Sequence, residues 1–289
     1  MSASPKIAVH LHLFYVEMWG MMRGYLSHLE PYGYHLCVTL VAEAPALEAE
    51  IRAFHPGAEV WVVENRGYDV GPFLSFLHRV DLSAYEVVLK LHTKNDKEGA
   101  LTWINHRRMN RRWWARLLPE ALLGSPARVQ KNLELFACDS QLGMLGSTHL
   151  VTYDPAHGEK VREELPRIMR RLGYEAWPFG FVVGTMFMVR SCILQKIKDC
   201  FGPGDCFPPS RADVRDGTTA HAFERAFGCL TLALGYKIAG VGHSFAFELA
   251  ALGTALLDFL YKRKVTAQRR LIIKICRIPV YIRRLPQEP

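Results

Sequence analysis

The sequence lacks the long hydrophobic run that a membrane-spanning helix needs. No stretch reaches about 18 uncharged apolar residues, and the nearest, 244–261, is interrupted by Glu248 and Asp258. The first residues show no cationic segment ahead of a long apolar one, so we expect no secretory signal peptide. Together these features predict a cytoplasmic protein without a membrane-spanning helix.

Paired cysteine motifs and internal repeats are also missing. The seven cysteines are odd in number and show no CxxC spacing, and several, such as Cys37, lie in apolar runs. We therefore expect neither a disulfide framework nor a zinc cluster, as is typical of a reducing cytosol. With 49% hydrophobic and 22% charged residues, the chain has the composition of a globular protein.

Excess charge is confined to one end of the chain. The net charge is +8, and residues 261–289 hold nine Lys/Arg and one acidic residue, so this tail carries the whole excess. The remaining body is neutral, although arginines and tryptophans cluster at 103–116. A neutral body argues against a nucleic-acid-binding protein, whose domains are usually basic.

Short apolar runs alternate with segments of helical periodicity through the first 92 residues. We predict strands at 6–16, 34–42, 59–64 and 85–92, and helices at 17–30, 45–55 and 72–79. Further helices are expected at 101–123, 126–137, 159–172, 191–199 and 217–234, and strands at 142–146, 181–189 and 236–241. This alternation indicates an α/β fold with a mostly parallel sheet. Ligands of such sheets bind beyond the carboxyl ends of the strands.

The loop NRGYDVG, at 65–71, follows the third predicted strand. Gly67 and Gly71 allow positive φ and a close approach of ligand to backbone. Arg66 can hold a phosphate through two parallel N–H groups. Asp69 can accept a hydrogen bond from a ribose hydroxyl or a nucleotide base. The alternative is an ordinary turn with a local Arg–Asp pair.

Three titratable side chains end the fourth predicted strand. Alternation places Lys90, His92 and Lys94 on one face. Charged groups are rare at the end of a buried strand, so this face predicts an anion site such as a diphosphate site. An edge strand with a solvated face is the alternative.

The segment DGTTAHAFE, at 216–224, opens a predicted helix. Asp216 is a candidate N-cap, and His221 and Glu224 share one helix face. An acidic side chain here can act as general base on a sugar hydroxyl. A capped helix with an exposed charged surface is the alternative.

The first strand offers weaker candidates. His10 and His12 share a face, but no nearby carboxylate pair completes a metal site, so we expect core or hydrogen-bonded histidines. Glu17 and Trp19 follow this strand and are possible contacts for a nucleotide base.

The basic tail mixes its charges with leucine and isoleucine. We predict a basic amphipathic helix or helix pair over 249–278, a composition typical of helices that lie in the membrane interface. Each basic residue near anionic lipid contributes about 1 kcal/mol. The residues expected at the membrane include Lys262, Arg263, Lys264, Arg269, Arg270, Lys274 and Arg277. A nucleic-acid tail and a partner-binding helix are the alternatives.

The body resembles the rhamnan synthesis protein F family of bacterial polysaccharide assembly, and the tail lies outside the resemblance. The matching stretches are IAVHLHLFY (7–15), ENRGYDVGPFL (64–74), YEVVLKLHTK (85–94), LGMLGS (142–147), GTMFMVR (184–190) and DGTTAHAFERAFG (216–228). The resemblance implies a GT-A-like, Rossmann-type domain, which we place at 1–248, followed by a membrane-associating tail at 249–289. It also implies a nucleotide-sugar glycosyltransferase.

The resemblance gives the candidate residues their roles. The general base would be Glu224, which lies 11 positions before Gly235, or Asp216. The donor would be held by Asn65, Arg66, Asp69, Lys90, His92 and Lys94. A GT-A enzyme carries an Asp-x-Asp metal motif where this chain has Lys90-Leu91-His92-Thr93-Lys94. That segment has no carboxylate for Mg²⁺, so we expect transfer without a metal or other cofactor.

The expected partners follow from the same resemblance. The donor would be dTDP-rhamnose or a related nucleotide sugar, and the acceptor a lipid-linked glycan of a surface polysaccharide such as an O-antigen. The chain would act in the cytoplasm, peripherally on the inner face of the bacterial plasma membrane. Alternatively, the chain has the same fold but does not catalyse transfer, and is a non-catalytic subunit that binds sugar or lipid phosphate in a polysaccharide assembly complex.

Overall fold

The computed structural model describes residues 5–94, 101–104, 107–203, 207, 216–265, 270–276 and 278–284. The chain forms two compact units. The first comprises Met1–Lys94 and Arg116–Gly242, and the second comprises Asn95–Ala115 and His243–Pro289. The boundary expected after residue 248 therefore falls a few residues inside the second unit, which also takes in an internal segment.

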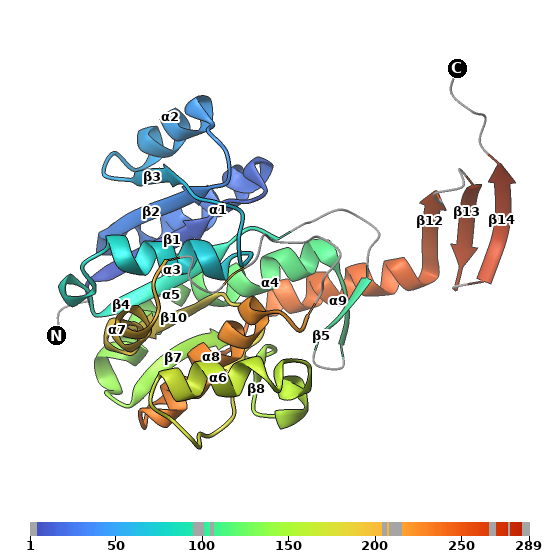
Figure 1. Ribbon diagram of the computed structural model, residues 1–289. Coiled ribbons are helices and arrows are strands. Elements are labelled where there is room, and N and C mark those ends of the chain that lie inside the picture. The colour runs from blue at the N-terminus through green and yellow to red at the C-terminus, as the bar shows by residue number, and fades with distance from the viewer. Residues whose placement is uncertain are drawn as a thin grey trace. The chain divides into compact units, whose positions relative to one another are not determined.

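A mixed sheet forms the centre of the first unit, and the described residues contribute seven strands in the order β11-β7-β10-β4-β1-β2-β3 (Figure 1). Their bounds are β1 Ile7–His12, β2 Tyr34–Leu40, β3 Glu59–Val62, β4 Val87–His92, β7 Leu142–Ser147, β10 Phe187–Arg190 and β11 Lys237–Val241. Strand β10 runs antiparallel to both of its neighbours, and the other pairs are parallel. The predicted α/β fold with a mostly parallel sheet is confirmed.

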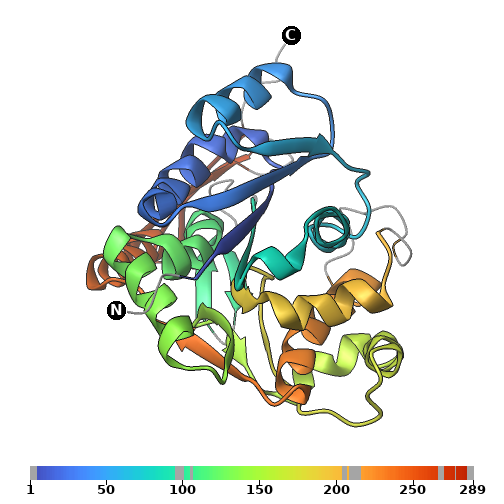
Figure 2. The same cartoon turned by 90° about the vertical axis from the view of Figure 1, so that its left-hand side faces the viewer.

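Helices cover both faces of this sheet, as Figure 2 shows. They are α1 Trp19–Leu26, α2 Pro45–Phe54, α3 Val70–Arg79, α5 Pro126–Cys138, α6 Glu164–Arg171, α7 Ser191–Cys200 and α8 Thr219–Ala233. Helices α3, α7 and α8 pack on one another and on the sheet. All residues of β1 and β4 are buried, because these central strands are covered on both faces and are mostly apolar.

Two sequence-based boundaries in the body were wrong. The helix predicted at 101–123 begins only with α4, Arg111–Leu123, and is preceded by a hairpin of β5 Leu101–Ile104 and β6 Arg107–Asn110. The single strand predicted at 181–189 is split into β9 Phe181–Val182 and β10, with β9 pairing with β8 Val151–Thr152. The split occurs at Gly184 and Thr185, which have φ of 90° and 53°, because positive φ is incompatible with a strand.

The helix predicted over 249–278 was correct only for its first part. Helix α9 spans Phe245–Leu260, and the chain then forms an antiparallel sheet of β12 Tyr261–Val265, β13 Arg270–Ile275 and β14 Ile278–Arg284. The density of isoleucine and valine explains the change, because β-branched side chains favour strands. Within the described ranges, no helix has both the length and the apolar character needed to cross a membrane.

Candidate functional site

Three segments that are distant in sequence meet around Asp69 at the carboxyl edge of the sheet. Asp69 lies in the loop before α3, Lys90 and His92 lie on β4, and Thr185 precedes β10. Because β10 is antiparallel, its first residues lie beside the last residues of β4. The carboxylate of Asp69 accepts a short hydrogen bond from Lys90 Nζ and one of 2.6 Å from Thr185 Oγ1.

Lys90 forms a buried ion pair with Asp69. Its side chain is 0% exposed, against 17% for Asp69, and its Nζ also donates to the Thr185 carbonyl oxygen at 3.0 Å. Burial would raise the pKa of Asp69, but the neighbouring His92, Lys90 and Lys94 hold it well below its usual range. The predicted role of Lys90 as a direct donor contact is therefore replaced by a role in holding Asp69.

His92 and Lys94 differ in what they can offer a ligand. Burial lowers the pKa of His92 well below its usual value, so the imidazole is neutral near pH 7, and its Nδ1 lies 3.4 Å from Asp69 Oδ2. Lys94 is half-buried, and burial lowers its pKa while Asp69 and Glu224 oppose that shift. Lys94 is thus the better placed of the two to supply positive charge.

The two histidines of β1 are core residues, as predicted. Both are buried, and His10 Nε2 and His12 Nδ1 each lie 3.0 Å from Thr39 Oγ1. Burial lowers the pKa of His12 to about 4. These histidines form a neutral layer beneath the carboxyl edge.

The glycines of the 65–71 loop serve packing and backbone geometry. A Cβ on Gly67, where φ is 68°, would lie 2.5 Å from the Phe207 ring, and one on Gly71 would lie 2.0 Å from the Arg66 carbonyl oxygen. Tyr68 also has a positive φ, of 54°, and backbone strain of this kind gathers at functional sites. The loop is therefore held in one uncommon conformation next to Asp69.

The other donor-binding candidates of this loop lie at the surface. Arg66 pairs with Glu64, with 2.5 Å between Nε and Oε2, and not with Asp69. Its side chain is 45% exposed, and Asn65 is exposed as well. Both remain accessible to a ligand above the carboxyl edge.

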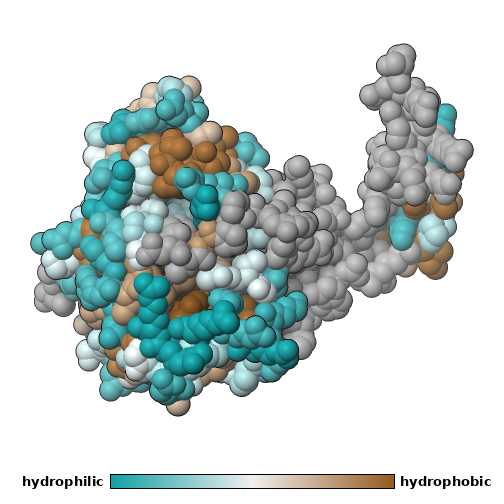
Figure 3. Space-filling model, viewed as in Figure 1, coloured by the Kyte–Doolittle hydropathy of each residue, from teal (hydrophilic) through white to brown (hydrophobic). Residues whose placement is uncertain are grey.

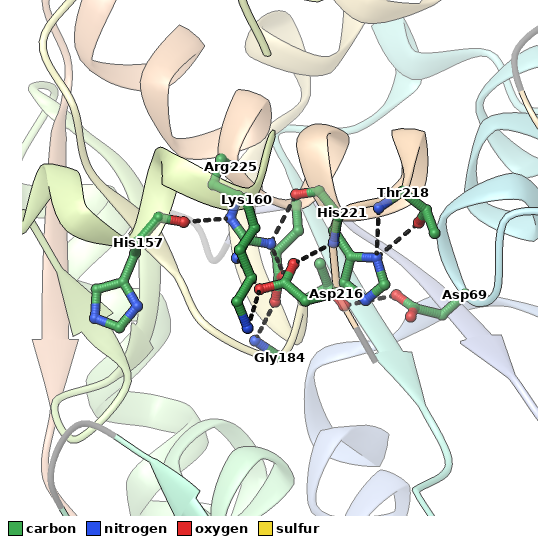
Figure 4. Close-up of polar contacts among 11 residues, drawn as sticks. Asp69, His157, Lys160, Gly184, Asp216, Thr218, His221 and Arg225 are labelled. Carbon is green, nitrogen blue, oxygen red and sulfur yellow. Dashed lines mark hydrogen bonds and ion pairs between the residues drawn. The ribbon is translucent and has the colours of Figure 1, made fainter. Parts of the chain in front are cut away.

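The start of α8 differs from the prediction. The N-cap is Thr218, which forms a capping box with His221, and Asp216 lies outside the helix. Asp216 instead accepts from Arg225 Nη2 at 3.1 Å (Figure 4). Thr218 occupies the cap because its hydroxyl reaches the N3 position of the helix.

Arg225 contacts several polar groups near the start of α8, and together they form a second cluster beside the one around Asp69. Its side chain is 6% exposed, and it donates to Glu224 Oε2 at 2.8 Å and to the carbonyl oxygens of His221 and His157 at 2.9 and 3.1 Å (Figure 4). A buried guanidinium with this many acceptors fixes the two carboxylates that it joins. Arg225 therefore sets the position of Glu224 and Asp216.

Glu224 connects the cluster around Asp69 with the cluster around Arg225 in one hydrogen-bond network. Its Oε1 accepts from the backbone N–H of Gly184 at 2.5 Å, and the next residue, Thr185, donates to Asp69. Glu224 also acts electrostatically on Lys90 and Lys94. Each Glu224 oxygen accepts one hydrogen bond within the network, and a carboxylate oxygen can accept a second, so a substrate hydroxyl can still donate to it.

The expectation for Trp19 as a base contact was wrong. Trp19 is 3% exposed and packs edge-on against Phe54, with 5.7 Å between ring centroids. Glu17 is exposed in a short 3-10 helix, Val16–Met18. The tryptophan belongs to the core because it packs on Phe54 at the end of α2, a contact that periodicity does not reveal.

Sequence reasoning also missed two members of the network, Thr185 and Arg225. Arg225 directly follows the predicted base, Glu224, and this position is a sequence signal for its role. Thr185 lies in the GTMFMVR stretch, but its contact with Asp69 depends on the antiparallel direction of β10. Neither residue type nor spacing indicates that direction.

Known proteins match most of this chain. The model of the family described as rhamnan synthesis protein F matches residues 1–236. Two relatives called uncharacterized protein WxcX, from two strains of Xanthomonas campestris pv. campestris, are each 28% identical over 244 residues, which is 82% of this chain and 33% of the relative. The chain thus spans about a third of the length of these relatives.

Solved structures give more distant similarity. A mycobacterial protein is 16% identical with a TM-score of 0.40, covering 97% of this chain and 86% of that one. Glucosyl-3-phosphoglycerate synthase from Mycobacterium tuberculosis, in complex with Mn²⁺, UDP and glucosyl-3-phosphoglycerate, is 13% identical with a TM-score of 0.32, covering 97% and 90%. Similarity this distant assigns no activity. The family match, by contrast, extends over residues 1–236 of 289, and the chain belongs to the rhamnan synthesis protein F family.

Proposed function

We propose that this chain is a glycosyltransferase that uses a nucleoside-diphosphate sugar, with dTDP-rhamnose as the favoured donor and a lipid-linked glycan as acceptor. Membership of the rhamnan synthesis protein F family supports a role in polysaccharide assembly. The observation that carries the proposal is the network that joins Asp69, Thr185, Glu224 and Arg225 at the carboxyl edge of the sheet. Ligands of open α/β sheets bind at this edge.

The donor diphosphate would lie beside Lys94. Lys94 is a half-buried residue, and a cation shielded from water stabilises developing phosphate charge more strongly than an exposed one. His92 is neutral and would supply only a hydrogen bond. Arg66 and Asn65, on the loop above, are candidates for contact with the rest of the nucleotide.

We propose that Lys94 takes the place of a metal ion in this reaction. Among the described residues, the Asp69 carboxylate lies beside the end of β4, and it is engaged by Lys90 and Thr185. Divalent metals of glycosyl transfer need free oxygen ligands. A carboxylate already bound to an ammonium group and a hydroxyl is a poor ligand for Mg²⁺.

Glu224 would act as the general base. In a single displacement, the acceptor oxygen forms a bond to the anomeric carbon of the sugar as the bond from that carbon to the diphosphate oxygen breaks. The acceptor hydroxyl gives its proton to Glu224, and the leaving nucleoside diphosphate keeps the electron pair of the broken bond. Asp216 is the alternative base, although its contact with Arg225 also suits a positioning role. A single displacement of this kind inverts the anomeric centre.

Donor binding can be tested by thermal shift with dTDP-, UDP- and GDP-sugars, with and without EDTA. We expect one nucleotide class to raise the melting temperature, because ligand at about 100 times its dissociation constant adds about 2.7 kcal/mol to the free energy of unfolding. EDTA should leave the shift unchanged. Lys94→Met should abolish the shift, and Lys237→Met, at an exposed lysine of β11, should retain it.

Two other results would count against parts of this proposal. A shift that disappears with EDTA would contradict transfer without metal and leave donor binding intact. If no nucleotide sugar shifts the melting temperature, even with a lipid-linked acceptor present, the non-catalytic sugar- or lipid-phosphate-binding role is favoured.

We further propose that the second unit binds the anionic inner face of the plasma membrane, where lipid-linked acceptors are found. Helix α9 carries exposed apolar side chains at helical spacing, at Phe245, Leu249, Leu252, Leu256 and Leu260. In the sheet that follows, further apolar residues are exposed, and they adjoin polar ones in Figure 3. An exposed apolar surface with cationic neighbours suits the interface of an anionic bilayer.

The basic residues of this unit supply the electrostatic part of membrane binding. The predicted set falls on β12 at Lys262, Arg263 and Lys264 and on β13 at Arg270 and Lys274, whereas Arg269 and Arg277 lie outside the described residues. In the register of the sheet, Lys262 is opposite Lys274. A cluster of basic residues in one small sheet is attracted to an anionic lipid surface.

Vesicle flotation tests this surface. We expect the full chain to float with vesicles that contain phosphatidylglycerol and not with pure phosphatidylcholine, and to bind less as salt increases. Leu252→Asp combined with Leu256→Asp should reduce binding at least about tenfold, because two buried leucines contribute several kcal/mol. Equal binding to both vesicle types, or a self-association abolished by the same variant, would contradict membrane docking.

A further inference from the structure

Three metal-ligating side chains gather at the other end of the sheet, where β2 and β3 begin. His35 and Cys37 are two positions apart on β2, and Glu59 of β3 is the register partner of Cys37. His35 Nε2 lies 2.7 Å from Glu59 Oε1 and 3.6 Å from Cys37 Sγ, and all three ligand atoms lie within 4.8 Å of one another. The candidate donor site lies at the opposite, carboxyl edge.

The chemistry of the three groups matches one class of ion. A thiolate, an imidazole and a carboxylate are the usual protein ligands of Zn²⁺. The charges of a thiolate and a carboxylate would together balance those of the ion. Such a set leaves the fourth tetrahedral position to water.

A fourth residue supplies the support that metal-binding histidines usually have. Tyr85 Oη lies 2.8 Å from His35 Nδ1, and the two rings are stacked. With a metal on Nε2, the Nδ1–H would donate to Tyr85 Oη, which fixes the tautomer and the orientation of the ring. The imidazole is therefore already oriented with Nε2 towards the sulfur and the carboxylate.

We propose that His35, Cys37 and Glu59 form a site for a single thiophilic divalent cation such as Zn²⁺. Binding would replace the thiol proton with a metal–sulfur bond and release that proton to solvent. The Glu59 carboxylate would move back by about half an ångström to admit an ion with metal–ligand distances of about 2.0–2.3 Å. Its side chain is 53% exposed, which leaves it free to do so.

The site would reinforce an otherwise weak part of the fold. Strand β3 has four residues and lies at the edge of the sheet, and the loop that carries Asp69 follows it. A metal between β2 and β3 would hold the first residue pair of this edge strand. This proposal does not depend on the transferase function, because its ligands and its readouts are separate from donor binding.

The competing description is an ordinary hydrogen-bonded cluster. His35 would then donate to Glu59 and accept from Tyr85, with Cys37 as a protonated core thiol beneath them. Burial raises the pKa of the Cys37 thiol, which suits this description in the absence of metal. The two descriptions differ in whether the chain binds a metal ion through sulfur.

Metal titration of the tag-free full chain, after removal of metal by chelation, decides between them. We expect one Zn²⁺ per chain, a rise in melting temperature with Zn²⁺, and a thiolate-to-metal charge-transfer absorption when Co²⁺ is used as the probe. Cys37→Ser should abolish that absorption, whereas Cys229→Ser, at another buried free cysteine, should retain it. Tyr85→Phe should weaken metal binding by about 10–100-fold.

A milder variant covers the case in which Cys37→Ser does not fold. Glu59→Gln, at a half-exposed position, should fold normally and lose most of its Zn²⁺ affinity. Absence of stoichiometric Zn²⁺ binding by the wild type would overturn the proposal. So would a Co²⁺ complex whose charge-transfer absorption survives in Cys37→Ser.

Discussion

Replacing Asp69 with alanine is expected to lower the free energy of unfolding by about 3–5 kcal/mol, because it leaves a buried charge without its partner. Lys90 is fully buried and donates to Asp69 and to the Thr185 carbonyl oxygen. The carbonyl oxygen alone is a weak substitute for a carboxylate. Urea denaturation of the variant and the wild type measures the difference.

The double variant Asp69→Ala, Lys90→Met separates the ion pair from other effects. With both charges removed, most of the lost stability should return, because a buried pair is often replaceable by apolar groups of similar size. Asp199→Ala, at a surface aspartate that contacts Gln195, should change stability by less than about 0.5 kcal/mol. A double variant no more stable than Asp69→Ala would show that the ion pair is not the reason for the loss.

Glu224→Gln is expected to lower the rate of sugar transfer by about 10²–10⁴-fold, the usual contribution of a general base. Glutamine keeps the size and one carbonyl oxygen of the side chain, so the donor should still bind. The change should fall on kcat with little effect on the KM of the donor. Steady-state kinetics with a donor identified by thermal shift measures both constants.

Asp216→Asn is the matched control for this prediction. Asp216 contacts Arg225 from outside α8, so its loss should act through the position of Arg225 and cost transfer less than Glu224→Gln does. A larger loss in Asp216→Asn would assign the base to Asp216. Full activity in both variants would support the non-catalytic role.

The strands and helices up to residue 92 were predictable from local pattern. Strand β1 is buried along its whole length, and α2 begins at Pro45, a residue favoured in the first turn of a helix. The carboxyl edge was a predictable location for a site, because parallel strands with charged residues at their ends are uncommon. The residue pattern therefore predicts Lys90, His92 and Asp69 at this edge, and the structure brings these side chains together.

The sequence-based predictions that failed concern features that depend on contacts between distant segments. Lys90 has the residue type of a phosphate ligand, but burial under Thr185 commits it to Asp69. The His35, Cys37 and Glu59 cluster has no sequence motif, because its members come from two strands brought into register by the sheet. The pattern of charged and apolar residues over 249–278 predicts a helix, but it suits strands equally, and strands follow α9.

The measurement that tests the central claim most directly is a transfer assay with dTDP-rhamnose, UDP-sugars and GDP-sugars in the presence of lipid-linked glycan acceptors. Release of nucleoside diphosphate and mass spectrometry of the acceptor report the two products. We predict that one donor class yields an acceptor heavier by one sugar, without added metal, and that Glu224→Gln loses this activity. If the folded wild type neither binds nor cleaves any of these donors with the acceptors present, the chain is not a nucleotide-sugar glycosyltransferase of the kind proposed.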